Sequence, residues 1–346
     1  MARYAPVGAA HRPPPTFVIR VPNTVLLVLL MLALAACEPM AASLATPQVI
    51  IITAVPSPTP PPTVTPTFTP TVSPTPTVAA TPTSTPAPCL SVSGQVEAFD
   101  TNPSEIAGEN LRYRVYLPPC YLESQRRFPV LILLHGASYT EAQWENISTI
   151  TALEQGMRLG ALPPMIVVMP FTGLIGNENS FPPQASYEGV LLDELIPAID
   201  RDFCTLRPRE YRAIGGISRG GFWAVSVALR HPDLFGAVGG HSAAFDATNA
   251  PPANNPLDLA RSAPLLEDAS LRIFLDNGAE DFAGLALQTF SSRLTARAIA
   301  HTYSIYPTGG HDEDYWRAHI GEYLAFYGQG WQRDTFALPS CLAPSP

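Results

Sequence analysis

The chain has 346 residues and a formal net charge of −9, from 20 basic and 29 acidic residues. This length leaves room for a leader, a linker and one enzyme-sized domain with a sizeable core. The acidic balance argues against a nucleic-acid partner.

The N-terminus has the pattern of a secretory signal. Three arginines precede an uncharged run from Val25 to Ala36, and an apolar core of 12 residues is short for a membrane span of about 20. The stretch Leu34 to Cys37 resembles a bacterial lipoprotein box, in which cleavage exposes an acylated cysteine. Residues 1–36 are therefore predicted to be a lipoprotein-type signal peptide, with Cys37 as the lipidation site. Ordinary cleavage after the two alanines and an uncleaved anchor are the alternatives.

Residues 37–88 are predicted to be a disordered tether. From Pro56 to Pro88 the chain is almost entirely proline and threonine with some serine, which cannot bury a core and favours extended polyproline geometry. At about 3.1 Å per residue, this segment could hold a domain up to roughly 100 Å from the anchor. No role is assigned to the short apolar run Val49–Ile52 that precedes it.

Four cysteines remain beyond Cys37, and an even number in an exported chain indicates two disulfides. They are Cys89, Cys120, Cys204 and Cys341. Of the three possible pairings we favour Cys89 with Cys120, which would clamp the first strands of the domain, and Cys204 with Cys341, which would pin the C-terminal tail. The cysteine spacings do not resemble a zinc site.

Residues 89–346 are predicted to form one α/β domain. Apolar segments of strand length alternate with helical ones, which is typical of a mostly parallel central sheet with helices on both faces. The predicted strands are 113–117, 129–134, 165–169, the run before Ser218, 235–238, 271–275 and 302–306. The predicted helices are 152–160, 191–203, the segment after Ser218, and 314–327.

Two segments, 171–187 and 244–264, contain clustered glycine, asparagine and proline and are predicted to be irregular surface loops. Loops that follow strands in such sheets line the active site. We expect these two loops to shape the pocket for the acyl or alcohol group of a substrate.

Ser218 lies in a Gly-x-Ser-x-Gly motif, from Gly216 to Gly220, between a predicted strand and a predicted helix. In such an elbow the serine has a strained backbone conformation, and the glycines let the strand and the helix approach closely. The hydroxyl is then exposed at the head of a helix, where the dipole and free N–H groups favour a developing negative charge. Ser218 is the candidate nucleophile.

A nucleophilic serine needs a histidine to take its proton and a carboxylate to orient that histidine. Asp281 follows the penultimate predicted strand, and His311 lies in a glycine-rich loop after the last one. Both should therefore reach the sheet edge of Ser218, in the order serine, acid, histidine. Asp281 is the preferred acid, with Asp276 and Glu280 as alternatives, and His311 is the candidate base.

The oxyanion hole of such a site needs two backbone N–H donors. One is expected from Arg219, immediately after the nucleophile, and the other from Ala137, in the loop 135–138 after a predicted strand. Two interpretations are open for the Arg219 side chain. It could contact an anionic group of the substrate, or it could have a surface or salt-bridge role.

The segment from about Tyr113 to Tyr327 resembles the esterase family of α/β-hydrolases that includes esterase D, feruloyl and acetylxylan esterases, enterochelin-esterase-like proteins and the antigen 85 mycolyltransferases. The resembling stretches are 133–136, 193–197, 212–221, 229–235, 310–312 and 315–316. The resemblance implies an α/β-hydrolase fold with Ser218, Asp281 and His311 as nucleophile, acid and base. The family most often has methionine where this chain has Arg219, and the first of the two loops matches nothing in it.

The sequence thus predicts a serine esterase that works through an acyl-enzyme intermediate. The substrate would be a small-molecule or glycan-linked carboxylic ester, with no metal or other cofactor. The protein is expected outside the cytoplasm, tethered to a bacterial membrane through an N-terminal lipid. Two other functions are open: an acyltransferase on the same fold, which passes the acyl group to a sugar or glycan, and a non-catalytic surface module that binds carbohydrate or a partner protein.

Overall fold

The computed structural model describes residues 48–52 and 88–342. The predicted signal peptide, its lipidation site Cys37 and most of the predicted tether lie outside the described residues. Within the two described ranges, no helix is both long and apolar enough to cross a membrane.

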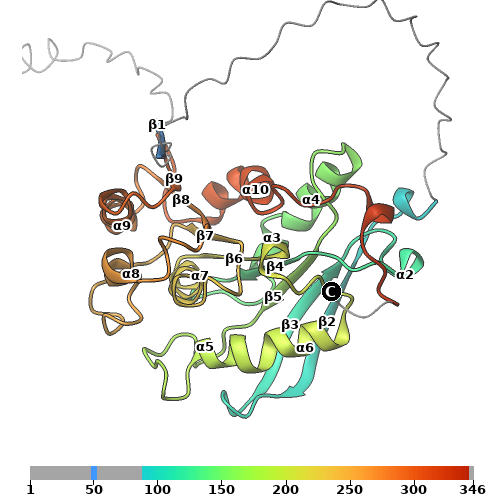
Figure 1. Cartoon of the computed structure of the whole chain (residues 1–346), viewed down its shortest axis with the longest axis horizontal. Coiled ribbons are helices and arrows are strands. Elements are labelled where there is room, and N and C mark those ends of the chain that lie inside the picture. Colours follow the sequence, from blue (N-terminus) through green and yellow to red (C-terminus); the bar gives the residue numbers. More distant parts are fainter. Residues whose placement is uncertain (1–47, 53–87, 343–346) are drawn as a thin grey trace, which may run out of the picture. The chain divides into compact units, whose positions relative to one another are not determined.

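The described residues contain one nine-stranded sheet, in the order β1-β9-β8-β7-β6-β4-β5-β3-β2 (Figure 1). The six strands β4 to β9 run parallel, whereas β1, β2 and β3 pair antiparallel at the two edges. The apolar run 49–52, for which the sequence offered no role, belongs to the edge strand β1. The strands are β1 (Gln48–Ile52), β2 (Gln95–Pro103), β3 (Asn110–Leu117), β4 (Val130–Leu134), β5 (Ile166–Pro170), β6 (Arg212–Ile217), β7 (Ala237–His241), β8 (Arg272–Gly278) and β9 (His301–Tyr306).

Helices cover both faces of this sheet, as the uninterrupted apolar strands require. One apolar core contains side chains of α5 to α9, and a second contains side chains of α3, α4 and α10. Figure 1 shows these two groups of helices on opposite sides of the sheet. The described α-helices are α2 (Tyr121–Ser124), α3 (Gln143–Asn146), α4 (Thr149–Arg158), α5 (Tyr187–Gly189), α6 (Ile196–Asp202), α7 (Arg219–Arg230), α8 (Pro256–Ser262), α9 (Gly284–Ala296) and α10 (Glu313–Tyr327); the π-helical segment η2 (Val190–Leu195) joins α5 to α6.

The prediction of an irregular loop over 244–264 is wrong in part, because α8 lies within it. The side chain of Asn255 accepts a hydrogen bond from the Leu257 N–H and so caps the first turn. Leu257 and Leu259 are then buried in the core. Two leucines among prolines and asparagines are too short a pattern to indicate a helix from sequence.

The structure has the two disulfides that the sequence analysis favoured, Cys89–Cys120 and Cys204–Cys341. The first joins the segment before β2 to the end of β3. The second joins the C-terminal segment to the end of α6, across a sequence separation of 137 residues. Bridges that close long loops restrict the unfolded chain strongly.

Candidate active site

Ser218 occupies a strained turn between β6 and α7. Its backbone angles are φ 54° and ψ −118°, a combination that residues other than glycine rarely adopt. The last residue of β7 and the segment that follows it hold this turn from both sides. The Ser218 N–H donates to the His241 carbonyl at 3.0 Å, and the Ala244 N–H donates to the Ser218 carbonyl at 3.0 Å.

The glycines around Ser218 are required by close packing. A Cβ at Gly216 would collide with the backbone of Gly220, and a Cβ at Gly220 would collide with the carbonyl of Leu134. Only glycine therefore lets α7 start directly above the ends of β4 and β6. This geometry matches the elbow expected from the sequence.

His311 and Asp281 form a hydrogen-bonded pair. His311 Nδ1 donates to Asp281 Oδ1 at 2.9 Å, and the Ala283 N–H donates to the same oxygen at 2.8 Å. The Asp281 side chain is fully buried, whereas the His311 side chain is 18% exposed. Burial alone would raise the pKa of Asp281, but the hydrogen bond from His311, the nearby Ser242 hydroxyl and the hydrogen bond from the Ala283 N–H outweigh burial and lower it. The carboxylate therefore stays ionised beside His311 at neutral pH.

A chain of contacts places Ser218 and His311 at the same edge of the sheet. Gly136 packs against both Ser218 and Tyr139: a Cβ added to this glycine would lie 3.5 Å from Ser218 Cβ and 3.3 Å from the Tyr139 ring. The rings of Tyr139 and Trp316 are 6.2 Å apart, and those of Trp316 and His311 are 5.2 Å apart. Among the described residues no hydrogen bond joins the Ser218 hydroxyl to His311. Such bonds are often long in enzymes without substrate and tighten in the substrate complex.

Of the three carboxylates considered from the sequence, Asp281 is the one that contacts His311. Glu280 instead accepts a hydrogen bond from the Gly309 N–H at 3.0 Å, which holds the loop that carries His311. Asp276 lies within β8 and is completely buried. The geometry thus favours Asp281 as the partner of the histidine.

Asp276 belongs to a separate buried network. Its Oδ1 lies 2.6 Å from His241 Nδ1, and its Oδ2 accepts hydrogen bonds from the hydroxyls of Tyr315 at 2.6 Å and Tyr323 at 2.7 Å. The other ring nitrogen of His241 lies 2.7 Å from the Tyr327 hydroxyl. Burial, and next the charge of Asp276, raise the pKa of Tyr315 and Tyr323. These side chains fix β7, β8 and α10 together at the carboxyl ends of the strands.

The loop 135–138, expected to supply an oxyanion donor, is held tightly beside Ser218. The Gly136 N–H donates to Gln143 Oε1 at 2.8 Å. The buried ring of His135 accepts from the Thr172 N–H at 2.9 Å through Nε2, so its Nδ1 donates to the Gly136 carbonyl at 2.7 Å. Burial lowers the pKa of His135, which agrees with a neutral ring. Ala137 follows at an exposed position.

Neither interpretation of the Arg219 side chain holds, because that side chain is buried in contact with the loop 171–187. Its guanidinium donates to the Gly176 carbonyl at 3.0 Å, the Glu178 carbonyl at 2.8 Å and Asn179 Oδ1 at 3.0 Å. It also lies over the Phe222 and Trp223 rings, 4.6 Å and 5.1 Å from their centroids. Burial lowers the pKa of Arg219 to about 10, so the cation remains charged at neutral pH.

The contacts of Arg219 fix the loop 171–187 to the helix that follows the nucleophile. Trp223 Nε1 donates to the Gly176 carbonyl at 2.7 Å, and Asn177 Nδ2 donates to the Ala137 carbonyl at 3.4 Å. The loop therefore touches both α7 and the segment 135–138. These contacts bring the loop beside the nucleophile, where the sequence analysis expected it to shape a pocket.

Phe282 supplies apolar surface next to His311. It follows Asp281 directly, its ring centroid is 4.2 Å from that of His311, and it is 72% exposed. An aromatic side chain left in solvent beside a reactive histidine offers a contact surface to a bound group.

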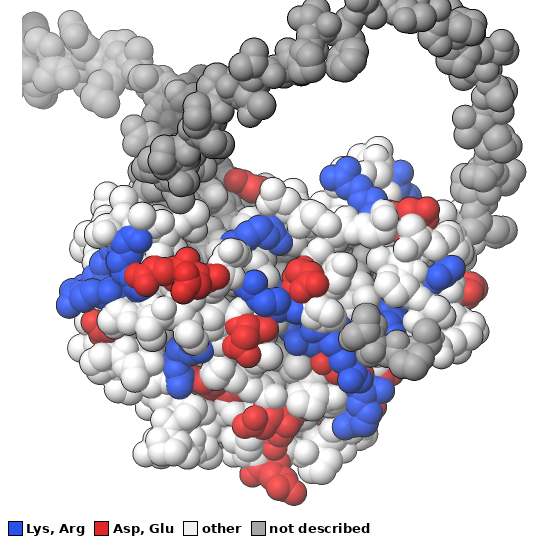
Figure 2. Space-filling view, in the orientation of Figure 1, with Lys and Arg blue, Asp and Glu red and all other residues white. Residues whose placement is uncertain are grey.

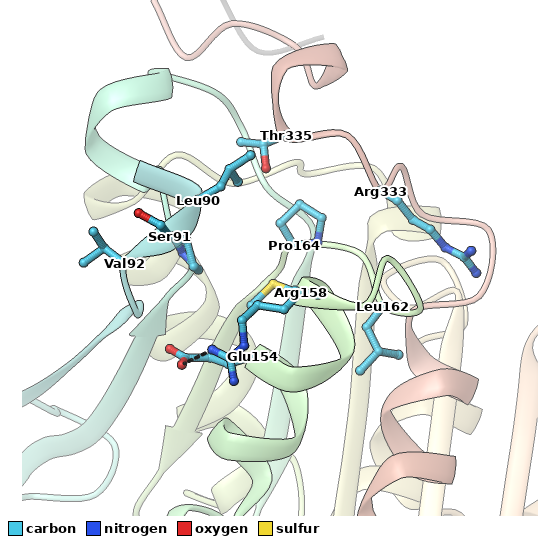
Figure 3. Close-up of a pocket in the computed structure, with 11 residues that line it drawn as sticks. Leu90, Ser91, Val92, Glu154, Arg158, Leu162, Pro164, Arg333 and Thr335 are labelled. Carbon is cyan, nitrogen blue, oxygen red and sulfur yellow. Dashed lines mark hydrogen bonds and ion pairs between the residues drawn. The ribbon is translucent and has the colours of Figure 1, made fainter. Parts of the chain in front are cut away.

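A cavity of about 420 Å³ lies away from these residues (Figure 3). It is lined by Leu90, Leu162, Pro164 and Arg333, and by Glu154 and Arg158, which form an ion pair. Leu162 and Pro164 precede β5, so the cavity lies at the amino ends of the parallel strands. Ligands of parallel sheets bind at the carboxyl ends, where Ser218 lies. The cavity is therefore separate from the candidate active site.

Charged side chains are interspersed on the molecular face drawn in Figure 2. Arginines lie there among aspartates and glutamates, and several arginines adjoin one another across the centre of this face.

Several residues at the site were not assigned from the sequence, among them Gln143, Ser242 and Trp316. Gln143 and Ser242 have no motif of their own: Gln143 accepts from the Gly136 N–H in the loop before it, and the contact of Ser242 with Trp316 is distant in sequence. Trp316 was part of a stretch that carries the family resemblance, although no role was given to it. Its position in the first helical turns after the His311 loop was the available signal.

A serine in a strained strand-to-helix turn and a histidine–aspartate pair, all at the carboxyl edge of a mostly parallel sheet, define the α/β-hydrolase class. Within that class, the chain belongs to the esterase family described as "Putative esterase", which it matches over residues 104–327.

Two curated relatives match part of the chain. An "Endo-1,4-beta-xylanase/feruloyl esterase" of Xylanibacter ruminicola is 36% identical over 146 residues, which cover 39% of this chain and 20% of that protein. "Esterase Rv1288" of Mycobacterium tuberculosis is 33% identical over 140 residues, which cover 39% of this chain and 29% of that protein. The chain thus spans less than a third of the length of these relatives.

Solved structures share the fold over most of their length. A "ferulic acid esterase" is 26% identical with a TM-score of 0.61, and the match covers 69% of this chain and 99% of that one. An S-formylglutathione hydrolase from Staphylococcus aureus is 20% identical with a TM-score of 0.59, covering 68% of this chain and 99% of that one. At this lower identity the likeness concerns the fold alone.

Proposed function

We propose that the protein is a serine hydrolase of carboxylic esters. In this proposal Ser218 Oγ attacks the ester carbonyl carbon while His311 takes the hydroxyl proton, and the ionised Asp281 holds His311 in the required tautomer. His311 then gives the proton to the departing alcohol. Water, deprotonated by His311, attacks the acyl-serine, releases the acid and restores Ser218.

The observation that carries this proposal is the His311–Asp281 hydrogen bond of 2.9 Å at the same sheet edge as Ser218 in its strained turn. The tetrahedral intermediate would be stabilised by two N–H groups, of Arg219 and Ala137. The Arg219 N–H is in the first turn of α7 and so has no acceptor within the helix. The Ala137 segment is fixed against Ser218 through Gly136.

A fluorophosphonate probe tests this assignment directly. The probe reacts with a serine only when a base activates its hydroxyl, so we expect the folded protein to be labelled at Ser218, as located by peptide mass spectrometry. Ser218→Ala should abolish the labelling. The matched control is Ser226→Ala, which removes a buried hydroxyl on α7 that bonds the Asn254 carbonyl and should leave labelling intact.

The labelling experiment also separates the rival functions. A folded wild-type protein that resists the probe would contradict the esterase proposal and favour a non-catalytic binding module. A labelled protein that transfers the acyl group to an added sugar in preference to water would instead be an acyltransferase.

We also propose that the enzyme works outside the cytoplasm, tethered through acylated Cys37. The two disulfides support the compartment, since such bonds persist in oxidising surroundings. The apolar run and the lipoprotein-like stretch before Cys37 support the tether.

Detergent phase partitioning of the full chain, expressed with its leader in a bacterial host, tests the tether. We expect the protein in the detergent phase, because a diacylated N-terminus is strongly apolar. Cys37→Ser should move it to the aqueous phase without changing esterase activity. Detergent partitioning that persists in Cys37→Ser would contradict lipidation at this cysteine.

A further inference from the structure

The ionised Asp281 has one oxygen with two donors and one with none. Oδ1 accepts from both His311 Nδ1 and the Ala283 N–H. Oδ2 is buried, and among the described residues no donor meets it with hydrogen-bond geometry. A buried carboxylate oxygen that lacks a donor is costly, so the groups next to it matter for how the carboxylate is held.

Ser242 lies against this carboxylate. No hydrogen bond of ordinary geometry joins its hydroxyl to Oδ2 of the carboxylate, but the nearby hydroxyl helps to lower the pKa of the acid. Its oxygen accepts a hydrogen bond from Trp316 Nε1 at 2.9 Å, so the hydroxyl hydrogen is not needed there and is free to turn toward the carboxylate. Ser242 and Trp316 are both buried, with exposed fractions of 0% and 1%.

The backbone fixes Ser242 firmly in this place. It has a left-handed conformation with φ 48°, directly after β7, and its N–H donates to the Asp276 carbonyl at 2.8 Å. The preceding residue, His241, accepts the hydrogen bond from the Ser218 N–H. One short segment, His241-Ser242, therefore holds the backbone of the nucleophile and faces the acid partner.

Trp316 contacts the other member of the pair. Its ring meets the His311 ring edge to face, with centroids 5.2 Å apart and an interplanar angle of 85°. The same indole donates to Ser242. Trp316 thus touches the histidine directly and reaches the carboxylate through one hydroxyl.

We propose that Ser242 and Trp316 are positioning residues that lock the Asp281–His311 pair in its productive orientation. This inference rests on the proposed esterase function. When His311 takes the proton of Ser218, the resulting imidazolium is stabilised by the carboxylate only if Oδ1 stays aligned with Nδ1. In this proposal the Ser242 hydroxyl turns toward the unpartnered Oδ2 and opposes rotation of the carboxylate, and Trp316 holds both the hydroxyl and the imidazole.

Steady-state kinetics on p-nitrophenyl acetate test the inference. Ser242→Ala should lower kcat by about 10- to 100-fold, because a hydrogen bond to a charged group is lost, with KM unchanged. Trp316→Phe keeps an aromatic ring but loses the donor, and should lower kcat by about 2- to 10-fold. The matched controls, Ser226→Ala and Trp331→Phe, each lose one side-chain hydrogen bond elsewhere in the fold and should leave kcat unchanged.

A double-mutant cycle with Asp281→Asn separates positioning from a general structural role. If Ser242 acts through the acid, Ser242→Ala should have little further effect on kcat once Asp281 is replaced. Equal effects in both backgrounds, or an unchanged kcat in Ser242→Ala, would overturn the inference. Failure of the esterase proposal itself would look different, since the wild-type protein would then resist the fluorophosphonate probe.

Discussion

His311→Ala is expected to lower kcat by about a million-fold, as much as Ser218→Ala, and the double variant to lose no more than either single one. The two side chains act in one step, because the hydroxyl is a nucleophile only while the imidazole takes its proton. Once either is absent, the other has nothing to contribute. What remains over the uncatalysed rate would come from substrate binding and the oxyanion donors.

The measurement is kcat for a short p-nitrophenyl ester at pH 8, with folding of each variant verified by circular dichroism. His319→Ala is a matched control, because its side chain on α10 has the same exposed fraction as that of His311, 18%. It should keep kcat close to the wild-type value. Losses that multiply in the double variant would show that Ser218 and His311 act independently, against the proposed mechanism.

The order of the candidate catalytic residues could be predicted from sequence because it follows from the fold. Parallel strands end at one edge, so residues directly after successive strands meet there. The choice between Asp276 and Asp281 was harder, since both come near the end of the same predicted strand. The strand β8 continues to Gly278, which makes Asp276 an interior strand residue and leaves Asp281 in the loop.

The role of the Arg219 side chain could not be predicted in the same way. Its partners lie about forty residues earlier in the chain, in a loop with no periodic pattern and no counterpart in the resemblance. All three of its acceptors depend on how that loop folds back on α7, whereas its two ring contacts lie within α7. An arginine that is buried against backbone carbonyls cannot be recognised from the residues next to it in sequence. The Gly-x-Ser-x-Gly elbow beside it can be recognised in this way.

Asp276→Ala is expected to lower the free energy of unfolding by about 3–5 kcal/mol, because it leaves buried donors without their acceptor. Asp276 is fully buried and meets His241, Tyr315 and Tyr323 within 2.7 Å. Removal of one partner from such a network lowers the free energy of unfolding by more than the whole network adds to it. The reason is that the remaining polar groups stay buried, away from water, without their partner. Urea denaturation followed by tryptophan fluorescence measures the change.

A matched control and a milder variant keep this prediction testable even if Asp276→Ala does not fold. Asp314→Ala removes a carboxylate of α10 that is 94% exposed and should leave the free energy of unfolding nearly unchanged. Tyr323→Phe removes one donor and should cost about 1 kcal/mol. If Asp276→Ala were as stable as Asp314→Ala, the network would not hold the strands together.

Replacement of Asp276, on β8, and of Asp281, in the loop after β8, should therefore have different effects. Asp281→Asn should impair kcat by about ten-thousand-fold, since the histidine loses its oriented tautomer, while the fold remains. A milder lesion in the Asp276 network, such as Tyr323→Phe, should lower the unfolding free energy while the folded fraction keeps its kcat. This difference between the two effects follows from the contacts. Asp281 bonds His311, which is partly exposed to solvent, whereas Asp276 bonds side chains that are buried.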